Sequence, residues 1–327
     1  MNVLVTGSAG HLGEALMRVL RAAGHQPFGV DLKPSAFTND VGSIAERSFV
    51  KRCMPHAQAV IHAATLHKPH VATHSRQAFV DTNITGTLNL LEEASAAGVA
   101  AFVYTSTTSV FGRAARPAAD APAAWITEDV PPEPRNIYGL TKLTAERLCE
   151  LFHRTRGLPC LVLRTSRFFP EADDDKATRE SYDDANAKVN EMLYRRADIE
   201  DVVSAHVLAL ERAASLEFAR YVVSATTPFT RGDLHELRTN APAVVRRRVP
   251  QYEAVYASLG WTMFPSIDRV YVNDRARAEL GWTPQYDFAR VVELLEQGSP
   301  ARSVLAQAVG SKGYHEETFK DGPYPVE

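Results

Sequence analysis

The 327-residue sequence has few cysteines, no long apolar run and almost no net charge. Its cysteines, Cys53, Cys149 and Cys160, lie far apart and outside any CxxC pattern, which indicates neither a disulfide framework nor a structural zinc site. No window approaches the roughly 18 consecutive apolar residues that a membrane span requires. With 36 Lys and Arg against 39 Asp and Glu, the chain also lacks the positive excess that favours binding to a phosphate backbone. These absences argue against a membrane protein and against a nucleic-acid partner.

The N-terminus lacks the features of a signal peptide. Residues 1–7 read as a strand followed by a glycine turn, without a basic region, an apolar stretch and a cleavage site. We therefore expect the fold to begin at residue 1 and the protein to work in the reducing cytoplasm. The length suits one large core with an added lobe, because single cores stop growing at roughly 250 to 300 residues.

The first 165 residues alternate between short apolar runs and longer amphipathic ones, which is typical of βαβ units around a parallel sheet. Candidate strands cover residues 3–5, 28–30, 59–62, 101–105 and 160–164, and candidate helices cover 11–23, 77–97 and 138–156. Gly24, Gly98 and Gly157 each follow such a helix, where a left-handed cap is expected. The pattern predicts an α/β fold with a Rossmann-type, doubly wound parallel sheet.

The remaining chain reads differently. Residues 113–135 contain five prolines and should form a long loop. Residues 170–188 are polar and acidic, and a helix at 201–214 and a strand at 220–224 follow. We expect residues 1–165 to form the Rossmann domain, with segments from about 189–225 returning to it. Residues 166–327 should mainly form a smaller substrate lobe and a polar tail from 310 to 327.

The run Gly7-Ser8-Ala9-Gly10-His11-Leu12-Gly13 follows the first candidate strand and opens the first helix. Such a turn lets the backbone approach a pyrophosphate whose charge faces the helix N-terminus. Without a ligand it would be only a tight turn, but Asp31 follows Gly7 by 24 positions, where a carboxylate can accept hydrogen bonds from ribose hydroxyls. Asp31 would also repel a 2′-phosphate. The sequence therefore predicts an NAD site rather than an NADP site, although Lys33 could soften this preference.

Tyr138 and Lys142 lie four residues apart, hence on one face of a helix. A lysine charge and an oxidised nicotinamide both favour the phenolate, so Tyr138 could exchange a proton with a substrate hydroxyl during hydride transfer. The pair alone could also be an exposed helical pair. Thr107 ends a candidate strand in a hydroxyl-rich turn, where it could donate to the substrate oxygen or simply cap the turn.

Together, the glycine turn, Asp31, the run from Asn83 to Leu91, the Ser106-Thr107 strand end and Tyr138xxxLys142 resemble the extended short-chain dehydrogenase/reductase family. The likeness is closest to its NAD-dependent epimerase/dehydratase branch, including UDP-glucose 4-epimerase-like members. It extends over most of residues 1–165 and returns at 198–202 and 278–284.

The resemblance implies roles for individual residues. Thr107, Tyr138 and Lys142 would be catalytic. Tyr138 and Lys142 would also bind the cofactor, Lys142 at the nicotinamide ribose. Asp40 and Val41 would contact the adenine, while Ala63, Ala64, Asn83 and Thr105 would line the cofactor. By the same analogy, the helices at 77–97 and 138–156 would pair with those of a second subunit in a homodimer.

The sequence departs from the family pattern at several substrate positions. The 4,6-dehydratases carry Asp-Glu after the catalytic Thr, where this chain has Thr108 and Ser109, which argues against a dehydratase and leaves Thr108 as a candidate substrate-binding residue. Arg167 stands where nucleotide-sugar members usually have Asn; it could hold a substrate carboxylate or phosphate, or pair with the acidic segment downstream. The diphosphate-binding Arg-Asp pair aligns with Tyr194-Arg195, and the segment between Arg164 and Asp201 is short. These departures favour a free sugar, a sugar acid or another polyol over a nucleotide sugar.

Three further clusters, one of histidines, one acidic and one basic, are not assigned a metal or a catalytic role. His67, His70 and His74 lack a fitting carboxylate partner, so we expect substrate-lining or surface histidines, with His67 in the substrate set, and no metal site. The acidic run Glu171, Asp173, Asp174 and Asp175 lacks a calcium-loop pattern and should be solvated. Arg246-Arg247-Arg248 is interpreted as an exposed basic patch.

These observations favour an NAD-dependent epimerase that oxidises a secondary alcohol of a sugar or nucleotide sugar and returns the hydride to the opposite face. A net NAD-dependent dehydrogenase or reductase of a free sugar, sugar acid or polyol would use the same residues. A cofactor-binding protein without catalysis is the third alternative, and the intact Tyr138, Lys142 and Thr107 argue against it.

Overall fold

The computed structural model describes residues 1–313, 315 and 319. Its main feature is a seven-stranded sheet in the order β3-β2-β1-β4-β5-β7-β8, in which every neighbouring pair is parallel. The strands are β1 (Asn2–Thr6), β2 (Gln26–Asp31), β3 (Asp40–Val41), β4 (Ala59–His62), β5 (Ala101–Thr107), β7 (Cys160–Thr165) and β8 (Phe218–Val223).

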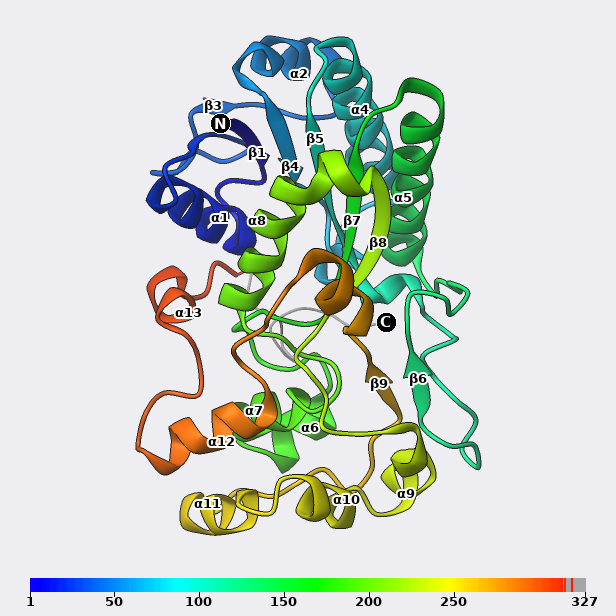
Figure 1. Cartoon of the computed structure of the whole chain (residues 1–327), viewed down its shortest axis with the longest axis vertical. Helices are drawn as coiled ribbons and strands as arrows, with labels where there is room; N and C mark the ends of the chain where they lie inside the picture. Colours follow the sequence, from blue (N-terminus) through cyan, green and yellow to red (C-terminus); the bar gives the residue numbers. More distant parts are fainter. Residues whose placement is uncertain (314, 316–318, 320–327) are drawn as a thin grey trace.

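Helices cover both faces of this sheet because successive strand residues point to opposite sides. Val3 and Val5 pack on one face with α1 (His11–Ala22), α8 (Ile199–Leu216) and α13 (Val304–Val309). Leu4 packs on the other face with α2 (Arg47–Cys53), α4 (Gly86–Ala96) and α5 (Ile137–Arg156). Short α3 (Arg76–Phe79) continues through the π-helical turn η3 (Val80–Thr85) into α4. Figure 1 shows these layers in its upper half.

A second hydrophobic cluster forms the lobe in the lower half of Figure 1. It contains buried side chains from α7 (Asp184–Glu191), α9 (Leu234–Thr239), α10 (Ala241–Arg248), α11 (Tyr252–Leu259) and α12 (Phe288–Glu296). Short α6 (Lys176–Ser181) precedes α7. Strand β6 (Ala124–Ile126) pairs in parallel with β9 (Arg269–Tyr271), which joins segments about 145 positions apart. The remaining short turns are η1 (Met54–His56), η2 (Lys68–His70), η4 (Thr108–Val110), η5 (Arg231–Asp233) and η6 (Ala276–Leu280).

The predicted α/β fold with its doubly wound parallel sheet is confirmed. The predicted strands and helices of the first 165 residues fall within β1, β2, β4, β5, β7 and the helical segments around α1, α4 and α5. Of the segment predicted as a long loop, residues 124–126 form β6, and the acidic segment contains α6 and the start of α7. Strands β3 and β9 were not predicted. Both are two or three residues long, too short for a periodic signal.

The predicted return of the chain to the sheet corresponds to α8 and β8, which pack on and pair with the sheet. The exact division into two domains stays a prediction. Most of the predicted tail lies outside the described residues. Within the described part of the chain, no helix is both long and apolar enough to cross a membrane.

Candidate active site

A cavity of about 1050 Å³ opens at the carboxyl ends of the sheet strands. Ligands of open α/β sheets bind at this edge. Most of the sequence-predicted site residues line it, namely Gly7, Gly10, His11, Leu12, Gly13, Asp31, Ala63, Ala64, His67, Thr105, Thr107, Thr108, Tyr138, Lys142 and Arg167. Asp40, Val41 and Asn83 do not line it.

The glycine turn brings backbone close to this cavity. Gly7 has φ +77°, and a Cβ at Gly13 would lie 1.9 Å from the Gly7 carbonyl oxygen, so larger residues would displace the turn. No side chain caps the N-terminus of α1, and one carboxylate oxygen of Asp31 accepts a hydrogen bond from the Ala9 N–H at 3.0 Å. The turn, the helix start and Asp31 therefore meet where a dinucleotide pyrophosphate and ribose would lie.

The three predicted cofactor residues outside the lining have other partners. Asp40 pairs with Arg52 at 3.3 Å, and Val41 is exposed, while the following Gly42 and Ser43 do line the cavity. Asn83 is buried behind the wall.

The Asn83 side chain connects the loop after β4 to α5. Its amide oxygen accepts from Thr65 Oγ1 and the Leu66 N–H, both at 2.8 Å, and its amide nitrogen donates to Thr141 Oγ1 at 3.0 Å. Asn83 thus positions cavity-lining segments rather than facing the cavity.

Tyr138 and Lys142 lie on the first turns of α5, whose N-terminus is capped by Asn136 through the Gly139 N–H at 3.0 Å. Lys142 Nζ donates to the Thr105 carbonyl oxygen at 2.6 Å and lies 4.3 Å from the Tyr104 ring centroid. These contacts hold the ammonium at the end of β5. The helix and the strand end therefore bring the three predicted catalytic residues to one wall of the cavity.

Burial favours the neutral forms of both groups. It raises the pKa of Tyr138 to about 12, against the lowering effect of a hydrogen bond with Thr107. Burial likewise lowers the pKa of Lys142 to about 7, opposed by the nearby Glu146 carboxylate. The expected lowering of the phenol pKa by Lys142 is therefore not the dominant influence in this structure. A cationic nicotinamide beside the phenol would lower the pKa of Tyr138.

Sequence reasoning missed His206, which supports this wall from α8. Its Nδ1 lies 2.7 Å from the Val202 carbonyl oxygen, and because a carbonyl only accepts, Nδ1 carries the proton. Nε2 then accepts from Thr105 Oγ1 at 2.8 Å, and burial lowers the pKa of His206 to about 4. No local pattern could have revealed this contact, which joins residues 101 positions apart.

Arg167 takes the ion-pairing alternative in this structure. It contacts Asp173, Asp174 at 2.5 Å and Glu191 at 2.8 Å. Lys68 also pairs with Asp174. Burial alone would raise the pKa of Asp174, but Arg167 and Lys68 outweigh it and hold the pKa well below its ordinary value. The prediction that the whole acidic run is solvated is therefore wrong for Asp173 and Asp174.

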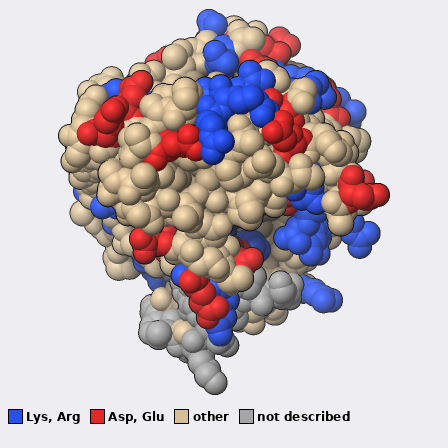
Figure 2. All heavy atoms as spheres, turned by 90° about the horizontal axis from the view of Figure 1, so that it is seen from below, with Lys and Arg blue, Asp and Glu red and all other residues tan. Residues whose placement is uncertain are grey.

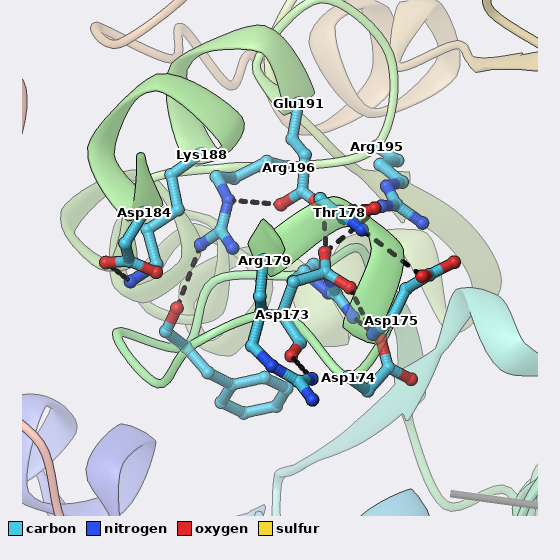
Figure 3. Close-up of polar contacts among 12 residues, drawn as sticks. Asp173, Asp174, Asp175, Thr178, Arg179, Asp184, Lys188, Glu191, Arg195 and Arg196 are labelled. Atoms are coloured by element: carbon cyan, nitrogen blue, oxygen red, sulfur yellow. Dashed lines mark hydrogen bonds and ion pairs between the residues drawn. The ribbon is translucent and has the colours of Figure 1, made fainter. Parts of the chain in front are cut away.

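The same network continues to Glu191, a buried carboxylate of α7. Glu191 lies between Arg195, at 2.7 Å, and Arg196, also at 2.7 Å (Figure 3). Charges that are separate clusters in the sequence thus pair with one another beside the cavity, which Lys68, Arg167 and Arg195 line.

The histidines after β4 lie beside the catalytic wall. His67 lines the cavity, with its ring centroid 6.2 Å from that of Tyr138 and 5.9 Å from that of Phe169. Burial lowers the pKa of His67 to about 3, so the ring is neutral at ordinary pH. In the described residues, no group of three or more His, Cys, Asp or Glu side chains is arranged to hold a metal ion.

The predicted basic patch at residues 246–248 is exposed, but its charges are paired. Arg246 pairs with Glu253 at 2.6 Å, and Arg247 and Arg248 pair with Glu236 and Asp233, both at 2.7 Å. Seen from below, basic groups on the lobe lie beside acidic ones (Figure 2).

Comparisons with known proteins identify the family of the chain. A family model described as the NAD dependent epimerase/dehydratase family matches residues 3–224. A UDP-glucose 4-epimerase of Rhizobium meliloti is 27% identical over 89% of this chain and 95% of its own length. A dTDP-glucose 4,6-dehydratase of Streptomyces antibioticus is 29% identical over 88% of this chain and 89% of its own.

Solved structures share the fold. A UDP-glucose 4-epimerase from Thermotoga maritima, with UDP-glucose, aligns with a TM-score of 0.61 and 22% identity over 91% of this chain and 99% of that one. A short-chain dehydrogenase/reductase superfamily protein from Agrobacterium tumefaciens, with bound NAD, aligns with a TM-score of 0.62 and 23% identity over 94% and 98%. The predicted resemblance, the enzyme class and the NAD cofactor are confirmed at family level, since the chain belongs to the NAD-dependent epimerase/dehydratase family.

Proposed function

We propose that this enzyme is an epimerase that transiently oxidises a secondary alcohol of a sugar or nucleotide sugar. The observation that carries the proposal is the convergence of Tyr138, Lys142 and Thr107 on one wall of the cavity that the glycine turn also lines. Tyr138 alone would fit many enzymes. Its combination with a dinucleotide turn and a strand-end hydroxyl fits hydride transfer to or from a carbinol.

In this proposal NAD supplies the hydride acceptor when it is bound. Tyr138 accepts the hydroxyl proton as the carbinol carbon is oxidised, and returns it when the ketone is reduced from its other face. Thr107, which hydrogen-bonds Tyr138, donates to the same substrate oxygen. Lys142, fixed by the Thr105 carbonyl, would hold the nicotinamide ribose, and its charge when protonated favours the phenolate.

The residues after Thr107 support epimerase chemistry better than elimination of water, whereas the relatives include both activities. One is named UDP-glucose 4-epimerase, and another is named dTDP-glucose 4,6-dehydratase. Thr108 lines the cavity immediately after the catalytic position, followed by Ser109, and neither supplies a carboxyl group. A general acid and base for dehydration are therefore missing from these two positions.

A net dehydrogenase or reductase of a free sugar, sugar acid or polyol is the second candidate. The departures at Arg167 and Tyr194-Arg195 support it, since Arg167 is already paired with carboxylates and Tyr194 offers no charge for a diphosphate. A Pseudomonas aeruginosa relative that matches half of this chain is named GDP-6-deoxy-D-mannose reductase, which supports net reduction but not a free sugar as substrate.

The two candidates differ in whether reducing equivalents leave the protein. We would incubate the purified enzyme with NAD and a panel of sugars, uronic acids and nucleotide sugars, following NADH absorbance while separating the products. A new stereoisomer with constant absorbance supports the epimerase. Rising absorbance with one substrate contradicts it and establishes the dehydrogenase.

We further propose that the protein acts in the cytoplasm as a homodimer. Cys53, Cys149 and Cys160 are free and buried, in keeping with a reducing compartment. Cell fractionation that recovered the protein outside the cytoplasm would contradict this assignment.

A further inference from the structure

The cavity wall is strongly cationic although the chain as a whole is not. Nine lining residues are basic and two are acidic among those described. The basic residues are Lys33, Lys68, Arg116, Arg135, Lys142, Arg167, Arg195, Arg269 and Lys312, and the acidic ones are Asp31 and Glu171.

Most of these charges already have a role or a partner. Lys33 lies beside Asp31 at the adenosine end, and Lys142 belongs to the catalytic wall. Lys68, Arg167 and Arg195 pair with Asp173 or Asp174, and Lys312 pairs with Glu14 at 2.5 Å. The three that remain are Arg116, Arg135 and Arg269.

These three arginines come from separate segments and share one region of the cavity. Arg116 and Arg135 lie near the two ends of the 113–135 segment, and Arg269 begins β9. Arg116 and Arg135 are exposed, and Arg269 is partly buried. The Arg113 N–H donates to the Glu133 carbonyl oxygen at 2.9 Å, and Arg269 Nη1 donates to the Ala115 carbonyl oxygen at 3.5 Å, so these contacts bring the three segments together.

Partial desolvation and the charges of Arg135 and Arg269 lower the pKa of Arg116, against the raising effects of Asp268 and Asp174. Like charges gathered at a cavity favour the binding of an anion.

The pairing within this group is incomplete. In the part of the chain that the structure describes, Arg116 and Arg135 make no ion pair, and Arg269 pairs with its neighbour Asp268 at 2.9 Å. The Nε atoms of Arg269 and Arg195, both cavity-lining residues, are buried without a hydrogen-bond partner. A buried N–H without an acceptor is unfavourable unless a ligand supplies one.

We propose that Arg116, Arg135 and Arg269 form a subsite for an oxyanion group, a phosphate or a carboxylate, of the substrate. Guanidinium groups bind both oxyanions through paired, charge-assisted hydrogen bonds. The inference rests on the proposed function and narrows its substrates to anionic sugars, with the anion held by these arginines rather than by Arg167.

The test measures binding without turnover. Purified enzyme is saturated with NAD, so that added anions cannot occupy the glycine turn, and titrated calorimetrically with inorganic phosphate, pyrophosphate and glucuronate, with glucose as the neutral comparison. We expect one of the anions to bind at least 10-fold more tightly than glucose. The preferred probe, phosphate-bearing or carboxylate-bearing, identifies the oxyanion.

In the double variant Arg116→Gln/Arg135→Gln, the affinity for that anion should fall at least 10-fold, and the affinity for NAD should be unchanged. Arg113→Gln, an exposed arginine of the same segment outside the cavity lining, serves as the matched control and should bind like the wild type. Arg269→Lys, which retains the charge, should bind the anion more tightly than Arg269→Gln.

Anion affinities equal in the wild type and the double variant, or no preference for anions over glucose, would overturn the subsite. Turnover of an anionic sugar with an unchanged KM in the double variant would reject the subsite and leave the proposed function standing. Anion binding that depends on these arginines, without turnover of any sugar, would support the subsite and reject the proposed function.

Discussion

At the scale of single residues, His206 shows how a buried side chain can fix a catalytic strand end. The neutral ring joins α8 to Thr105, whose carbonyl holds Lys142. Because burial lowers its pKa to about 4, from about 6.5 in an unfolded chain, the unfolded state takes up the proton first as pH falls. We predict that His206 lowers the unfolding free energy by about 1.4 kcal/mol between pH 7.5 and pH 5.5.

Urea unfolding of the wild type and His206→Gln at the two pH values checks this prediction. The variant should be less stable at pH 7.5, and its deficit should shrink by about 1.4 kcal/mol at pH 5.5. His235→Gln, at an exposed position of α9, should keep the wild-type pH dependence. An equal deficit of His206→Gln at both pH values would show that the ring does not titrate as proposed.

At the scale of elements, helix α5 exposes two leucines outside the active site. Leu140 is 51% exposed and Leu151 is 40% exposed, and their 11-residue separation, about three turns, places them on one face. If α5 forms the proposed dimer contact, Leu151→Asp should shift the protein from dimer to monomer in sedimentation analysis. Val304→Asp on α13, at a position 78% exposed, should remain dimeric. A monomeric wild type would refute the dimer.

Elements with strong local patterns could be predicted from the sequence, whereas those created by distant contacts could not. The buried strands around β1, β4 and β5 are continuous apolar runs, and Gly157 adopts the left-handed cap expected after α5. Strand β6 forms because Ala124 pairs with Arg269, for which neither segment carries a local signal. Asp173 and Asp174 looked solvated because their partners, Lys68 and Arg167, reach them only in the folded chain.

At the scale of the whole molecule, a net charge of -3 conceals a cationic cavity. The totals of acidic and basic residues could argue against a nucleic-acid partner. They could not show that nine basic residues and only two acidic ones line the cavity among the described residues. The glycine turn, Asp31 and the Tyr138 and Lys142 pair could be predicted because each is a local pattern at an element end. The contact of His206 with Thr105 and the contact of Asn83 with Thr141 could not be predicted, because both depend on packing between elements.

The most direct test of catalysis by Tyr138 compares the wild type with Tyr138→Phe, which removes only the phenolic hydroxyl. NAD affinity, measured by fluorescence titration, should be unchanged, since the glycine turn and Asp31 remain. Turnover of whichever sugar the wild type converts should fall roughly 100-fold or more, because the proton acceptor is lost. Unchanged turnover with normal NAD binding would contradict the assignment of Tyr138 as the catalytic base.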